Sequence, residues 1–119
     1  MKIAVTSKGT DLNSEVDPRF GRAAYIIIVD SETLDYQVID NKEGVAAMKG
    51  AGIQAAKAVT DTGAEVLLTG FCGPNAMNAL RAGKVSVAGG ASGSVKDAVT
   101  AYLNGELSLL DKANVEGHW

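Results

Sequence analysis

Two arginines that bracket a Phe-Gly pair are the most chemically suggestive feature of this chain. Arg19 and Arg22 flank Phe20-Gly21, and the apolar run that follows, residues 25–29, is typical of a buried strand. Arginine stays protonated and presents its N–H donors in a fixed fork, so an arginine pair suits an anion with several oxygen or sulfur atoms. In a protein of net charge −3, this pattern indicates a local anion site.

The surroundings of the arginine pair leave two interpretations open. Lys8, shortly before it in the sequence, is a third candidate cation, and Gly21 allows an unusual backbone between the two arginines. The alternative is an ordinary solvated loop in which Arg19 pairs with Asp17 or with a carboxylate that faces it from a helix.

Two glycine-rich turns are further candidate parts of a binding site. Gly70-Phe71-Cys72-Gly73 comes directly before a predicted helix, and a second turn that includes Gly90 and Ser92 precedes another. Glycine permits close approach of the backbone, and the N–H groups at a helix start favour an anion. Neither turn matches the Walker or dinucleotide fingerprints, so plain strand-to-helix turns are the alternative.

A single cysteine and a single histidine limit the chemistry of the chain. They exclude a disulfide within the chain, a cysteine-rich zinc site and a four-thiolate iron–sulfur cluster. Cys72 is either a small packed residue or a thiolate that acts as a nucleophile or a soft-metal ligand. His118 is the penultimate residue, a poor position for a catalytic triad.

The bulk composition indicates one ordinary globular domain. The chain has 119 residues, of which 46% are apolar and 21% charged. Its acidic balance argues against non-specific nucleic-acid binding, and no segment is long and apolar enough for a membrane span. We therefore expect a cytoplasmic protein.

Hydrophobic periodicity predicts an α/β fold with a mixed five-stranded sheet and three helices. The helices are expected at residues 51–62, 74–82 and 95–103, with Ser94 and Asp97 as a capping box, and 41–49 as a loop. A domain is expected at 1–105 and a tail without periodicity at 106–119. The predicted strands are 2–6, 24–30, 35–39, 65–69 and 84–88, in the sheet order 3-2-1-4-5.

This topology brings the candidate residues to one edge of the sheet. The parallel strands 2–6, 65–69 and 84–88 end at the same edge, so the loops 7–23, 70–73 and 89–93 meet there. Strand 2–6 contains no acidic residue. The sheet therefore lacks the carboxylates with which a two-metal nuclease would hold its ions.

Four motifs occur in order along the chain: Arg19-Phe20-Gly21-Arg22-Ala23, Gly50-Ala51-Gly52-Ile53, Thr69-Gly70-x-x-Gly73-Pro74-Asn75-Ala76 and Gly89-Gly90. Together they resemble the dinitrogenase iron–molybdenum cofactor biosynthesis family, which includes NifX and the C-terminal domain of NifB. The resemblance covers residues 1–105 and implies a ribonuclease-H-like fold and a carrier of metal–sulfur clusters.

Stand-alone family members with the same Arg-Phe-Gly-Arg loop imply a particular cofactor. It is a non-covalently held molybdenum–copper sulfide cluster, in which copper bridges tetrathiomolybdate units. Nitrogenase-pathway relatives have His-Phe-Gly where this chain has Arg19, which cannot coordinate a metal and would instead donate N–H···S contacts. The expected cluster-binding residues are Lys8, Arg19, Phe20, Gly21, Arg22, Ile53, Gly70, Phe71, Cys72, Gly73, Met77, Gly90 and Ser92, with Cys72 as the candidate metal ligand.

The expected function is therefore a non-enzymatic, monomeric cluster carrier that delivers its cargo to a transient protein partner. No nucleic acid or membrane is expected as a partner. Two alternatives stay open: a thiol-based redox or sensor protein that uses Cys72, and an interaction module that acts through the tail with His118 and Trp119.

Overall fold

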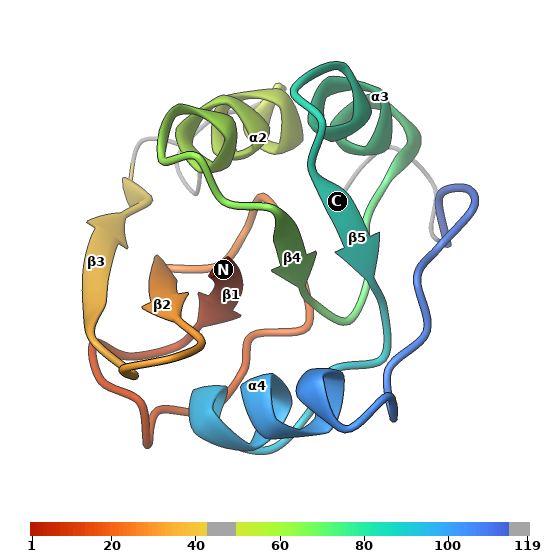
Figure 1. Ribbon diagram of the computed structural model, residues 1–119. Helices are drawn as coiled ribbons and strands as arrows, with labels where there is room; N and C mark the ends of the chain where they lie inside the picture. The colour runs from red at the N-terminus through yellow and green to blue at the C-terminus, as the bar shows by residue number, and fades with distance from the viewer. Residues whose placement is uncertain (43–49, 115–119) are drawn as a thin grey trace.

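The fold is one mixed sheet between two layers of helices, as Figure 1 shows. It is seen here in a computed structural model that describes residues 1–42 and 50–114. The predicted loop 41–49 thus lies largely outside the described residues, as do His118 and Trp119. The described elements are β1 (Lys2–Ser7), β2 (Tyr25–Asp30), β3 (Tyr36–Asp40), α2 (Ala51–Asp61), β4 (Val66–Leu68), α3 (Pro74–Ala82), β5 (Ser86–Ala88) and α4 (Val95–Leu103).

The strand order is β3-β2-β1-β4-β5, which confirms the predicted sheet. β1 pairs antiparallel with β2 and parallel with β4, while β2–β3 is an antiparallel hairpin and β4–β5 a parallel pair. The carboxyl ends of β1, β4 and β5 therefore lie at the same edge.

The apolar run of β2 is buried because helices or loops cover both faces of the sheet. Ile26 and Ile28 belong to the core cluster under α2 and α3, whereas Ile27 and Val29 belong to the cluster under α4. Alternate residues of a strand point to opposite faces, so one apolar segment supplies both cores. Figure 1 shows α2 and α3 on one side of the sheet and α4 on the other.

β5 begins later than predicted, and its neighbour α3 explains why. Lys84 adopts a left-handed backbone with φ of 61°, and the Val85 N–H returns to the Leu80 carbonyl at 2.9 Å. The turn that follows α3 therefore occupies residues 84 and 85, which the pattern assigned to a strand. The predicted helix 74–82 is confirmed, with Gly83 as its C-cap.

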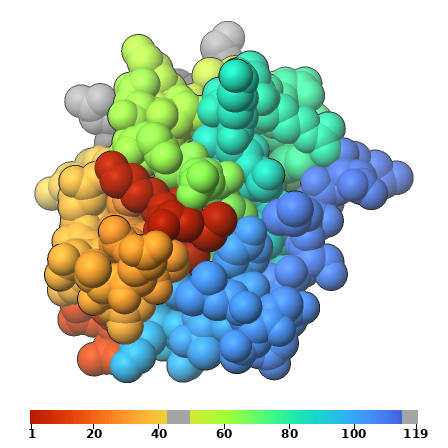
Figure 2. Space-filling view, viewed as in Figure 1, coloured from red at the N-terminus to blue at the C-terminus, as the bar shows by residue number. Residues whose placement is uncertain are grey.

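A segment that follows α4, residues 105–114, runs along the outer edge of β5. In Figures 1 and 2 it is the deep-blue part of the chain beside α4 and β5. Leu109 forms an isolated antiparallel bridge with Ala88, and the Leu110 N–H donates to the Val87 carbonyl at 2.7 Å. Sequence periodicity gave no sign of this docking. None of the helices in the described ranges has the length and apolar character needed to cross a membrane.

Candidate functional site

The long loop between β1 and β2 crosses the carboxyl edge of the sheet in two parts, a first limb of residues 8–16 and a second limb of residues 17–24. In the first, the Val16 N–H donates to the Gly93 carbonyl at 2.9 Å, beside the start of α4. Lys8 belongs to this limb, where its ammonium lies 3.5 Å from the Glu15 carboxylate. Arg19 and Arg22 belong to the second limb, so the loop places the predicted cations in two different surroundings.

The second limb lies beside the turn that follows β4. The Phe71 N–H donates to the Pro18 carbonyl at 2.7 Å, and the Phe20 N–H donates to the Phe71 carbonyl at 3.2 Å. These two bonds form a parallel bridge between Arg19 and Phe71. A Cβ at Gly70 would lie 2.7 Å from the Cβ of Pro18, so only glycine allows this approach. The predicted meeting of the arginine loop with the 70–73 turn is thus present.

The starts of α2 and α3 complete this surface. Gly21, with φ of +94°, packs so closely on the first turn of α2 that a Cβ there would lie 3.0 Å from the Gly52 nitrogen. A Cβ on Gly52 would in turn lie 3.1 Å from the Cβ of Ala76, in the first turn of α3. The start of α2 therefore adjoins the arginine loop directly, and the start of α3 lies beside that of α2.

These two helix starts differ from that of α4 in how they are capped. The N-cap residues of α2 and α3 are Gly50 and Gly73, which offer no side-chain acceptor, and neither first turn contains an acidic residue. On the other face of the sheet, α4 has the predicted capping box, in which Ser94 and Asp97 bond each other's backbone N–H. The positive ends of α2 and α3 thus lack the side-chain oxygen that neutralises a helix start.

Arg19 is oriented by a neighbouring carboxylate. Its Nε lies 3.7 Å from Asp17 Oδ1, and the same oxygen accepts the Arg19 backbone N–H at 3.0 Å. The Asp17 side chain is only 7% exposed, whereas that of Arg19 is 51% exposed. The pairing considered from the sequence therefore exists, and it fixes a guanidinium that still faces solvent.

The predicted apolar residues separate into buried and exposed members. Phe20 and Met77 lie in the core under α2 and α3, at 1% and 2% exposure. Ile53 and Phe71 are 49% and 41% exposed, on segments that contact the arginine loop. The exposed apolar surface near the arginines therefore comes from Ile53 and Phe71.

Cys72 has the properties of a packed thiol. It is fully buried, and this burial raises the pKa of the Cys72 thiol to about 12. Its Sγ–H points to the Gly73 carbonyl at 3.9 Å. Metal ligation and nucleophilic attack both need the thiolate, which burial disfavours. Across residues 1–42 and 50–114, no three His, Cys, Asp or Glu side chains come together as metal ligands would.

The second glycine turn, after β5, supports the first. The Ala91 N–H donates to the Thr69 carbonyl at 3.1 Å, and the Gly90 N–H donates to the Gly70 carbonyl at 3.4 Å. Two backbone donors of this turn are thus already engaged in holding the 69–70 backbone, and Ser92 is exposed beside them.

Two threonines that sequence reasoning missed connect the loop to the sheet. The Thr6 hydroxyl donates to the Asp17 carbonyl at 2.6 Å, and its oxygen lies 2.9 Å from that of Thr69. Because Thr6 and Thr69 are the last residues of the predicted parallel strands 2–6 and 65–69, which are neighbours in the predicted sheet, the sequence already indicated that they lie side by side.

Two asparagines that hold carbonyls of the site loops gave no comparable signal. Asn41 Nδ2 donates to the Ala23 carbonyl at 2.8 Å, while Asn114 Nδ2 donates to the Gly70 carbonyl at 3.0 Å. A single asparagine in a polar segment is ordinary, so the sequence did not distinguish them.

Comparison with known proteins gives a consistent picture. Residues 1–105 match the sequence profile of the dinitrogenase iron-molybdenum cofactor family. No curated protein matches the chain.

Solved structures extend the comparison. The apo orange protein from Desulfovibrio gigas is 40% identical, with 96% of each chain covered and a TM-score of 0.93. A NifB-like protein from Thermotoga is 34% identical, with 98% of each chain covered and a TM-score of 0.83. A dinitrogenase-like protein from Methanocaldococcus jannaschii, at 16% identity and a TM-score of 0.69, with 94% of this chain and 96% of its own covered, shares the fold.

Proposed function

Because the chain belongs to the dinitrogenase iron-molybdenum cofactor family, we propose that it is a non-catalytic carrier of an anionic metal–sulfur cluster. One observation carries this proposal. The loop with Arg19 and Arg22 adjoins the start of α2 and the turn that leads into α3, and both helix N-termini lack a capping side chain and an acidic first turn. Positive charge and N–H groups that converge in this way suit a polyanion.

The residues present fit a cluster that is held without protein ligands to its metals. Arg19 and Arg22 would donate N–H···S contacts, while Gly21, Gly70 and Gly73 would let the backbone come close. Ile53 and Phe71 would supply apolar contacts that exclude water and strengthen the charge interactions. Lys8, Gly90 and Ser92 border the same edge of the sheet and would add an outer rim.

We propose further that the cargo is a molybdenum–copper sulfide cluster, in which copper bridges tetrathiomolybdate units. Such a cluster carries its own sulfide ligands and several negative charges, so it needs cations and N–H donors more than thiolates. This agrees with an arginine at position 19 and with the buried, protonated Cys72. The carrier would act as a monomer and hand its cluster to a protein partner.

The same burial counts against the alternative in which Cys72 acts as a redox or sensor thiol, because reactive thiols are accessible and ionised. The alternative that places His118 and Trp119 in a protein interface concerns residues outside the described ranges, and no observation favours it.

Reconstitution tests the proposal directly. The apoprotein is mixed with tetrathiomolybdate and Cu(I), separated by gel filtration, and analysed for molybdenum, copper and absorbance. We expect uptake by the wild type, and an affinity at least about tenfold lower for the Arg19→Ala/Arg22→Ala double variant, because hydrogen bonds to charged groups contribute about 1.5–3 kcal/mol.

Lys57→Ala/Lys96→Ala is the matched control, since it removes two exposed cations, from α2 and α4, that lie outside the arginine loop. Added salt should weaken binding to the wild type but affect the double variant less. Failure of the wild type to retain molybdenum, or equal retention by the double variant, would contradict the proposal.

A further inference from the structure

The segment after α4 is attached to the sheet and ends at the candidate site. Its Leu109 bridges Ala88 at the edge of β5, while Leu110 and Ala113 pack against the core under α2 and α3. The next residue, Asn114, lies beside the turn that follows β4. The segment thus brings a distant part of the sequence to the loop that contacts Arg19.

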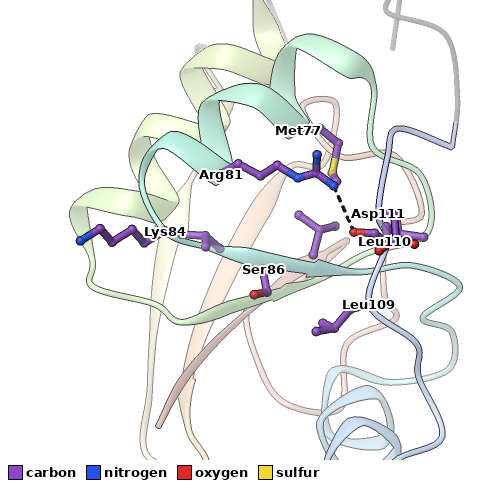
Figure 3. Close-up of a pocket in the computed structure, with 9 residues that line it drawn as sticks. Met77, Arg81, Lys84, Ser86, Leu109, Leu110 and Asp111 are labelled. Atoms are coloured by element: carbon purple, nitrogen blue, oxygen red, sulfur yellow. Dashed lines mark hydrogen bonds between the residues drawn. The ribbon is translucent and has the colours of Figure 1, made fainter.

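A hollow of about 270 Å³ separates the middle of this segment from α3 (Figure 3). Arg81 reaches from α3 toward the segment, where its Nη2 donates to the Leu110 carbonyl at 3.5 Å. Since that bond is long and the guanidinium is exposed, α3 holds the segment weakly. Its position therefore depends on its pairing with β5, on the packing of Leu110 and Ala113 against the core, and on the bonds of Asn114.

Asn114 makes three hydrogen bonds to the turn. Its Oδ1 accepts the Cys72 N–H at 2.8 Å, and its Nδ2 donates to the Gly70 carbonyl at 3.0 Å. Its backbone N–H donates to the Cys72 carbonyl at 3.2 Å. A carboxamide is suited to this task because it carries one acceptor and one donor group, whereas a carboxylate would only accept.

The same turn is bound on its other side by the arginine limb. The N–H and carbonyl of Phe71 bond Pro18 and Phe20, the residues on either side of Arg19. The main chain of residues 70–72 thus alternates between two neighbours, with Gly70 and Cys72 bonded to Asn114 and Phe71 bonded to the limb. Displacement of Asn114 would therefore shift the backbone of residues 70–72, which is bonded to the residues on either side of Arg19.

We infer that Asn114 is a positioning residue for the proposed cluster site. Asn114 is not proposed to contact the cluster. It fixes the backbone of residues 70–72 and, through the bonds of Phe71, the position of Arg19. The segment 105–114 is then a functional part of the site. This inference rests on the proposed function, and its experiment separates the two.

The test combines amide exchange in the apoprotein with cluster uptake. In Asn114→Ala, the Cys72 amide should exchange at least about fivefold faster, because a bond of about 1 kcal/mol is lost. Uptake of tetrathiomolybdate with Cu(I) should weaken by a similar factor. The isosteric Asn114→Asp keeps the acceptor for the Cys72 N–H, so that amide should stay protected while uptake still weakens.

Asn78, an exposed residue of α3, provides matched controls: Asn78→Ala for side-chain loss and Asn78→Asp for the added charge. Uptake by folded Asn114→Ala within about twofold of wild type would overturn the inference and leave the proposed function standing. If the wild type takes up no cluster, the proposed function fails. In that case, unchanged amide exchange at Phe71 and Cys72 in Asn114→Ala would overturn the positioning role as well. Faster amide exchange at both residues would show that Asn114 still fixes the backbone of the turn.

Discussion

Asp17 holds Arg19 at two points, since one carboxylate oxygen accepts the Arg19 backbone N–H at 3.0 Å and lies 3.7 Å from its Nε. The backbone bond shapes the loop, whereas the ion pair competes with any anion for the guanidinium. Because Asp17 is nearly buried, its negative charge is screened less than that of a surface carboxylate. The two contacts therefore have opposite effects on the proposed site.

Substitution Asp17→Asn should separate these effects. The amide oxygen still accepts the Arg19 N–H, but the negative charge near the cluster is gone. We expect the affinity for tetrathiomolybdate with Cu(I) to rise about three- to tenfold at low ionic strength, from an ion-pair term of about 1 kcal/mol. The control is Glu65→Gln, which removes an exposed carboxylate directly before β4, at the opposite edge of the sheet from the site. An equal rise in both variants would show that only net charge matters.

The Thr6–Thr69 hydroxyl pair should contribute unequally to stability. Thr6→Val leaves the Asp17 carbonyl without its 2.6 Å donor, so we expect a loss of about 2–3 kcal/mol in the free energy of unfolding. Thr69→Val removes only the contact between hydroxyls, with an expected loss of about 1 kcal/mol. Urea denaturation measures both, and the double variant should lose less than the sum, because the two changes remove one shared bond. Strict additivity would contradict this arrangement.

Much of the fold could be predicted because its determinants are local. The apolar run of β2 and the Ser94–Asp97 capping box depend on neighbours within a few residues, and both were predicted correctly. The predicted start of β5 was wrong because the turn that follows α3 extends to Val85 through a left-handed Lys84. A lysine gives no local sign of that conformation, whereas glycine would.

The site was predictable only as far as the topology determines it. Strand order alone brings the arginine loop to the 70–73 turn, so Arg19 and Phe71 were expected together. The burial of Phe20 and Met77 depends on how α2 and α3 pack, and the bonds of Asn114 join residues 42 or more positions apart. Side-chain bonds of that range leave no pattern in the sequence.

Alanine substitution of two glycines should distinguish close packing from backbone strain. In Gly70→Ala, the new Cβ would lie within 2.8 Å of the Pro18 Cα and carbonyl oxygen, and backbone atoms cannot easily move. We expect a loss of about 3 kcal/mol or more, with weaker cluster uptake, since the loop must separate from the turn. Gly90 has φ of +75° and open space around it, so Gly90→Ala should cost only about 1 kcal/mol. Thermal and urea unfolding compare the two, and equal losses would contradict the close approach.

The thiol of Cys72 should be inert in the folded protein. With a pKa near 12 against an ordinary 9.0, its thiolate fraction at pH 8 is roughly a thousandfold lower than that of an unfolded chain. Iodoacetamide should therefore modify Cys72 rapidly in urea and very slowly without it. A rate in native buffer equal to that in urea would instead support the thiol-sensor alternative.

The same raised pKa links Cys72 to stability in alkaline solution. A raised pKa means that the folded state keeps a proton which the unfolded state releases, so the stabilisation is complete below pH 9 and is lost as pH rises from about 9 toward 12. Other groups titrate in this range, and the comparison with Cys72→Ala isolates the thiol. We expect the free energy of unfolding of wild type to fall more steeply than that of Cys72→Ala between about pH 9 and 10.5, measured by urea denaturation. If the free energy of unfolding falls equally steeply with pH in both proteins, burial does not hold the proton on Cys72. Separately, intact cluster uptake by Cys72→Ala would show that the site works without this sulfur.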